Sequence, residues 1–94
     1  MANREEAMSI QIKRHPVSPV DTTEDRVDTV VTVALGHVTG RIVRSQYDAG
    51  TISYNAHIEL VGDRSPNQID DPQDLRNLGT VAITLADELA AVTT

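Results

Sequence analysis

The chain has 94 residues and a net charge of −6 at neutral pH, with no Cys, Phe or Trp and two Tyr. The lack of cysteine excludes disulfides, thiolate nucleophiles and cysteine-ligated metals, and the shortage of aromatic rings disfavours sites that stack bases, sugars or flat cofactors. No apolar run approaches the ~20 residues of a membrane-spanning helix, and the chain start lacks the apolar core of a signal peptide, so we expect a cytoplasmic protein with no membrane partner.

The charge is distributed unevenly. Residues 1–20 carry three basic and two acidic side chains, or +1, whereas residues 21–94 carry five and twelve, or −7. An acidic body disfavours binding to nucleic acid, which needs clustered positive charge. We expect a tail or short edge strand over residues 1–20 and a single α+β domain over residues 21–94. The arginine-rich basic set is typical of a bacterial or phage coding bias.

Three runs alternate apolar and polar residues with a period of two, which is typical of strands with one buried face. They cover residues 27–35, 41–47 and 51–61, and the third alternation is the clearest. Residues 9–13 alternate in the same way over a shorter stretch and predict an edge strand. Pro16 and Pro19 then favour an extended connection over residues 15–24, because proline lacks a donor and restricts its predecessor.

The turn at residues 36–40 sets the register of the first two long strands. Pairing Gly36 with Gly40 leaves a three-residue turn that contains His37 and places Val33 opposite Val43. Both glycines then lie where unusual backbone angles are expected.

The next turn allows two registers. A two-residue loop at residues 49–50 places Tyr47 opposite Ile52, whereas a three-residue loop places Arg44 opposite Tyr54. We favour the two-residue loop because it keeps the apolar side chains together, with Val43 on the same face.

Residues 72–92 predict a long helix. Asp71 is a natural N-cap, Pro72 suits the first helical position, and Asp74 places negative charge at the positive helix end. The apolar positions that recur at steps of three and four predict the face that packs on the sheet. They are Leu75, Leu78, Ala82, Leu85, Leu89 and Val92. The expected fold class is α+β, a three- to four-stranded antiparallel sheet packed on one face by a long C-terminal helix.

A second apolar series runs beside the first on the same helix. It comprises Gly79, Ile83, Ala86 and Ala90. One side of a helix suffices for docking on a sheet, so the second series indicates an interface, unless the N-terminal segment covers it. The covering residues would be Ile10, Ile12 or Val17. A glycine inside a helix costs about 1 kcal/mol relative to Ala, which indicates close approach of another backbone at Gly79.

A second candidate interface lies on the sheet face that points away from the helix. Its apolar members are Val30, Ala34 and Ile42, beside polar residues that could form a rim. The same pattern also fits an ordinary solvent-exposed face.

His57 and Glu59 share one face of the third predicted strand, and they are the weak candidates for catalysis. Arg44 is expected opposite Asn55 nearby. A zinc site needs three or four ligands and the sequence places no third one, so we expect neither a metal site nor a cofactor.

Three functional hypotheses follow. The first is a small non-catalytic protein–protein interaction or assembly module, self-associating as a homo-oligomer, with no catalytic site. The alternative is an acidic inhibitor or nucleic-acid mimic that binds a basic partner, for which salt-sensitive binding would be diagnostic. The third is a small enzyme or ligand-binding domain with a site near His57 and Glu59, for which loss of activity in His57→Ala would be diagnostic.

Overall fold

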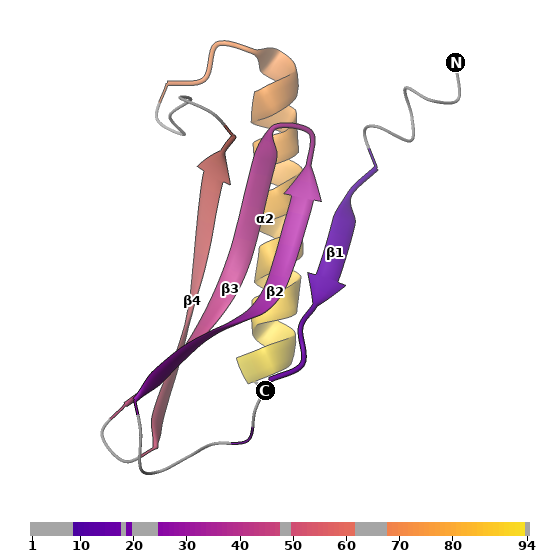
Figure 1. The fold of residues 1–94 in the computed structure, drawn as a ribbon. Helices are drawn as coiled ribbons and strands as arrows, with labels where there is room; N and C mark the ends of the chain where they lie inside the picture. The colour runs from indigo at the N-terminus through magenta and orange to yellow at the C-terminus, as the bar shows by residue number, and fades with distance from the viewer. Residues whose placement is uncertain (1–8, 18, 20–24, 48–49, 62–67, 94) are drawn as a thin grey trace.

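The described residues form a four-stranded antiparallel sheet with one long helix against it (Figure 1). The computed structural model describes residues 9–17, 19, 25–47, 50–61 and 68–93. The strands are β1 (Gln11–Arg14), β2 (Arg26–Leu35), β3 (Val38–Tyr47) and β4 (Thr51–Leu60), and the helix is α2 (Pro72–Thr93). The order in the sheet follows the chain, β1-β2-β3-β4, so β1 and β4 are its edges. The predicted α+β class is confirmed.

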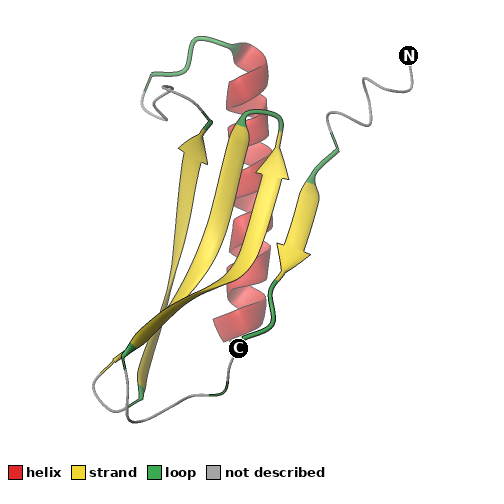
Figure 2. Ribbon diagram, in the orientation of Figure 1, coloured by secondary structure: helices red, strands yellow, loops and turns green. Residues whose placement is uncertain are grey.

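All of the helix lies on one face of the sheet, behind it in Figure 2. The core between the two layers is aliphatic and rich in β-branched residues, which suit a pleated surface. Its members are Val31, Val33, Leu35, Val38, Ile42, Leu60, Val81 and Leu85. We call the sheet face that carries them the helix side and the opposite face the outer side.

The β3–β4 register is that of the three-residue loop, and not of the favoured two-residue loop. Tyr47 pairs with Thr51, and Arg44 pairs with Tyr54. Three residues therefore connect the strands, and the two-residue loop prediction is wrong. Arg44 is accepted on the helix side because its guanidinium Nη2 donates to Asp28 Oδ2 over 3.2 Å. The expected alternation of β4 is confirmed, since Tyr54 and Ile58 both pack against the core.

The β2–β3 turn is also tighter than predicted. Leu35 pairs with Val38, and Val33 pairs with Gly40, so only Gly36 and His37 form the turn. Gly36 has a φ of 58°, as the first central residue of a two-residue hairpin requires. An irregularity between Thr29 and Val31 then shifts the register further along the hairpin. A parity argument on sequence alone cannot detect such an inserted residue.

The second glycine, Gly40, has a packing role and not a turn role. A Cβ at this position would lie 2.5 Å from Leu85 Cδ1 and 2.9 Å from Val81 Cγ1. Gly40 therefore allows α2 to approach β3 near the start of the strand. The sequence predicted unusual backbone angles at Gly40, but the residue lies inside a regular strand.

Helix α2 begins as predicted. Asp71 Oδ1 accepts a hydrogen bond of 2.9 Å from the backbone N–H of Gln73, which is the N-cap geometry. The buried face is rotated relative to the prediction, because it includes two polar residues near the N-terminus. Its fully buried members are Asp74, Asn77, Val81 and Leu85. Leu75 and Ala82 were predicted on that face, but both are exposed, Leu75 at 56%.

Candidate functional site

The most prominent candidate surface is the exposed side of α2. All its members are exposed, including Ile83 at 68%. They are Leu75, Gly79, Ala82, Ile83, Ala86 and Ala90, and we call them the outer helix stripe. A Cβ at Gly79 would meet nothing within 4 Å. The four positions predicted for the second series are thus open within the described part of the chain.

The N-terminal segment takes a different place from the one that would cover this stripe. Ile12 lies in β1, opposite Val33, and Ile10 packs against the core. β1 therefore extends the sheet at its edge beside β2 (Figure 1).

The second predicted interface does not form a patch. Ile42 is fully buried beneath the helix, opposite Val31. Val30, at the irregularity in β2, packs partly against the core. Only Ala34 has the expected position, because its partners Gln11 and Thr39 alternate with the core residues. The expectation that Val30, Ala34 and Ile42 share the outer side is wrong, since it followed from the incorrect hairpin registers.

His57 and Glu59 do share the outer side of β4, and both are exposed. Arg41 lies opposite His57, and Thr39 lies opposite Glu59. The predicted neighbour Arg44 belongs to the helix side instead. Among the described residues, no group of three His, Cys, Asp or Glu side chains could hold a metal ion. The pair is an exposed His and an exposed carboxylate on one strand face.

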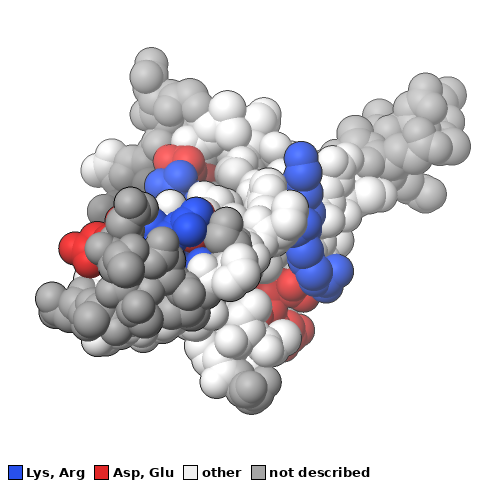
Figure 3. Space-filling model, turned by 60° about the horizontal axis from the view of Figure 1, so that its bottom comes forward, with Lys and Arg blue, Asp and Glu red and all other residues white. Residues whose placement is uncertain are grey.

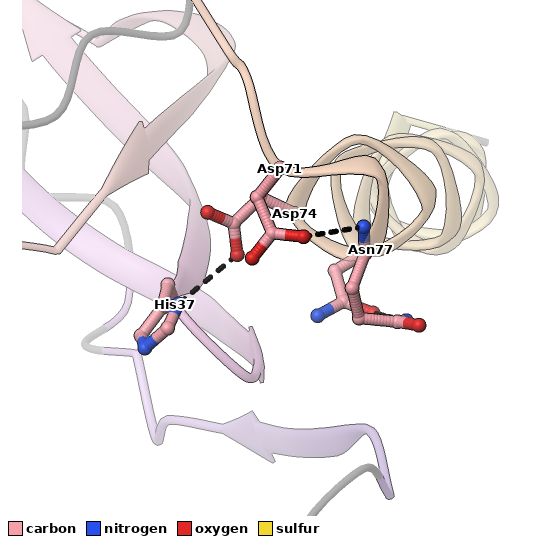
Figure 4. Close-up of polar contacts among 5 residues, drawn as sticks. His37, Asp71, Asp74 and Asn77 are labelled. Atoms are coloured by element: carbon pink, nitrogen blue, oxygen red, sulfur yellow. Dashed lines mark hydrogen bonds and ion pairs between the residues drawn. The ribbon is translucent and has the colours of Figure 1, made fainter.

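A polar cluster that the sequence analysis missed joins the β2–β3 turn to the start of α2 (Figure 4). The imidazole Nδ1–H of His37 donates to Asp74 Oδ1 over 3.0 Å. Asp74 is only 3% exposed, whereas the His37 side chain is 56% exposed. The buried carboxylate lies in the first turn of the helix, where the helix dipole stabilises negative charge.

Asn77 completes this turn–helix cluster. Its Oδ1 accepts a hydrogen bond of 2.9 Å from Gln73 Nε2, and its amide lies over Gly36, where a Cβ would approach Asn77 Nδ2 to 2.5 Å. The backbone carbonyl of His37 also accepts a hydrogen bond of 2.8 Å from Val61 N–H. The cluster fixes the position of the helix start against the hairpin. The available sequence signal was that the polar residues Asp74 and Asn77 continue the helical spacing of the buried Val81 and Leu85.

A second polar contact fastens β1 to α2. Arg14 and Glu88 form a two-point interaction in which Nε donates to Oε1 and Nη2 to Oε2, both over 2.8 Å. The hydrogen bonds from Arg14 lower the pKa of Glu88, and the same hydrogen bonds raise the pKa of Arg14. The Glu88 side chain is 14% exposed and that of Arg14 is 68% exposed. This contact connects the short edge strand to the helix as well as to β2.

Charges of both signs are mixed on the face shown in Figure 3. Lysine and arginine side chains lie beside aspartate and glutamate side chains among the described residues there.

The described helix is not sufficiently long and apolar to cross a membrane.

Comparison with known proteins adds no relative. No protein-family model matches the chain, and neither a curated protein nor a solved structure matches it.

Proposed function

We propose that the protein is a small non-catalytic module that self-associates through the outer helix stripe. The observation that carries this proposal is the exposure of a large apolar side chain, Ile83, among small residues on a helix whose other side already packs on the sheet. Exposed apolar surface of this kind marks contact sites. A domain of this size with an aliphatic core also gains stability from association.

The shape of the stripe supports a second copy of the chain as the partner. Ile83 lies between Gly79 and Ala86 along the stripe, and the side chains of these two residues project little from the helix. Two such helices can pack antiparallel, with Ile83 of each copy resting over the small residues of the other. Small residues permit close approach of two helix backbones.

Charge supports the same arrangement. Arg76 and Asp87 are both exposed and lie on the same flank of the stripe, because their separation is close to three full turns. In an antiparallel pair related by a two-fold axis, the same flank of each helix lies beside that flank of the other helix. Arg76 of one copy then lies near Asp87 of the other, whereas a parallel pair would not create this attraction.

The test is the solution mass measured by light scattering over a range of concentrations. We expect a wild-type mass above that of one chain, and an association that Ile83→Asp weakens by at least about a hundredfold, because an unpaired carboxylate would be buried. Gln68→Asp is the control, since it adds the same charge at an exposed position before the helix, away from both the stripe and the flank that carries Arg76 and Asp87. A wild-type monomer at every concentration would contradict self-association, and an unaffected Ile83→Asp variant would contradict the stripe as its site.

A further inference from the structure

The two edges of the sheet differ in how they are protected against pairing with another strand. β1 has only four residues, includes Lys13, and is followed closely by Pro16. Short length, lysine and proline are the usual features that prevent edge-to-edge association. The Arg14–Glu88 contact further ties this edge to the helix.

β4 has none of these protective features. It runs for ten residues, Thr51–Leu60, without lysine or proline. Its pairing with β3 continues through all ten positions with no register shift. Within the described part of the chain, no strand pairs with its other side. A long, regular edge of this kind presents unpaired backbone N–H and C=O groups that another strand can satisfy.

We propose that the free edge of β4 pairs antiparallel with β4 of a second copy and so joins two sheets into one. This contact is separate from the helix contact proposed above and goes beyond it.

The side chains of β4 favour a second copy because the strand is complementary to itself. In a pairing centred on Ala56, directly opposite residues have numbers that sum to 112, so Tyr54 faces Ile58 and Ile52 faces Leu60 on the helix side. Directly opposite residues share a face in an antiparallel pair. Every apolar residue of β4 then has an apolar partner, and those that are half-buried in one copy gain cover.

The outer side of β4 is compatible with the same register. His57 lies opposite Asn55, and Glu59 lies opposite Ser53, so no two acidic groups are directly opposed. A register in which the numbers of opposed residues sum to an odd value would place apolar residues opposite polar ones. Even sums other than 112 would leave either Ile52 or Leu60 without a partner in the strand. The Ala56-centred register is therefore the one that uses all five apolar residues of the strand.

The helices leave room for this pairing. α2 packs mainly over β3, where Gly40 receives Leu85. Two copies joined through β4 place their β3 strands three strand spacings apart, or about 14 Å. Packed helices need about 8–10 Å between their axes. The two helices thus fit side by side on the same face of the joined sheet.

A single introduced cysteine tests the pairing directly, because the natural chain contains none. Ala56 is exposed and lies on the proposed two-fold axis. The two Cα atoms of a directly opposed pair are about 4.5–5.5 Å apart, which a disulfide can span. We expect Ala56→Cys to oxidise to a cross-linked dimer about a hundredfold faster than an unpaired thiol at micromolar concentration, because association raises the effective concentration.

Glu59→Cys is the matched control. It lies on the same exposed strand but off the axis, so alone it should not cross-link. Mixed with Ser53→Cys, it should form a heterodimer, which verifies the register. Cross-linking of Glu59→Cys alone at the rate of Ala56→Cys would overturn the proposed pairing, because it would show random collision.

Ile83→Cys separates this inference from the proposed function. Rapid cross-linking at Ile83 with none at Ala56 would retain the helix contact and overturn the β4 contact. Rapid cross-linking at Ala56, with no effect of Ile83→Asp on the mass, would support the β4 contact and contradict the stripe. A wild-type chain that is monomeric at every concentration, with no cross-linking at Ala56, would overturn both.

Discussion

At the scale of single residues, two glycines with opposite surroundings provide a paired prediction. Gly40→Ala should destabilise the protein by about 1–3 kcal/mol, because its new Cβ would overlap Leu85 and Val81 in the core. Gly79→Ala should stabilise the isolated chain by about 0.5–1 kcal/mol, since its Cβ meets open space and alanine favours the helix. Urea unfolding at low protein concentration measures both values. Equal effects of the two substitutions would contradict the packing assigned to Gly40.

Asp74 provides the second prediction at this scale. Asp74→Ala should cost about 1–3 kcal/mol, because it removes a buried hydrogen-bond acceptor and leaves the start of α2 without its contact to His37. The matched control is Asp87→Ala on the exposed side of the same helix, for which a change within about 0.5 kcal/mol is expected. Chemical unfolding of both variants at low protein concentration is the measurement, so that the proposed Arg76–Asp87 contact between copies does not contribute. Comparable losses would mean that Asp74 acts through its charge alone.

At the scale of elements, the Arg14–Glu88 contact joins β1 to the helix in addition to its pairing with β2. The pKa of Glu88 is lowered in the folded protein by the hydrogen bonds from Arg14, so this contribution to stability is present above the unfolded pKa of the carboxyl group and is lost as the pH falls through the lower folded value. Glu88→Gln should therefore speed amide exchange in β1 at neutral pH. The difference from wild type should disappear in acid.

Hydrogen exchange across a pH series measures this effect. Asp87→Asn is the control because Asp87 is adjacent but exposed. Exchange in β1 that is unchanged at neutral pH in Glu88→Gln would show that pairing with β2 alone holds the edge strand.

The elements themselves could be predicted from the sequence, but their registers could not. Alternation located the three long strands, and the Asp71–Pro72 pair located the helix start, because both signals depend on neighbouring residues. A register depends on contacts between distant residues. The contact between Asp28 and Arg44, 3.2 Å long, makes an arginine acceptable on the helix side, and no local pattern reveals it.

The candidate sites divide in the same way. The exposure of Gly79, Ile83, Ala86 and Ala90 follows from helix periodicity, and the structure reproduces it. The predicted interface of Val30, Ala34 and Ile42 is not formed, because its prediction depended on an incorrect hairpin register. The turn–helix cluster was missed because Asp74 and Asn77 look like ordinary polar helix residues until the β2–β3 turn is placed beside them.

At the scale of the whole molecule, the helix stripe and the β4 edge lie on different parts of one chain. Each contact is isologous, meaning that the same surface occurs on both partners. A chain with two isologous contacts builds a closed tetramer or a longer array, whereas a chain with one builds only a dimer. The solution mass of single-surface variants therefore shows which contacts are used: loss of either surface should reduce the assembly to a dimer held by the other.

Thermal stability should follow the same logic, since association with the folded chain stabilises it by mass action. The midpoint temperature of wild-type unfolding should rise with protein concentration. Each tenfold increase in concentration adds roughly 1.4 kcal/mol to the stability of a dimer. Combining Ile83→Asp with Ala56→Lys should abolish this dependence, because lysine protects an edge strand against pairing. Both positions are exposed in the single chain, so the double variant should still fold. A midpoint that keeps its concentration dependence in the double variant would place the association on another surface.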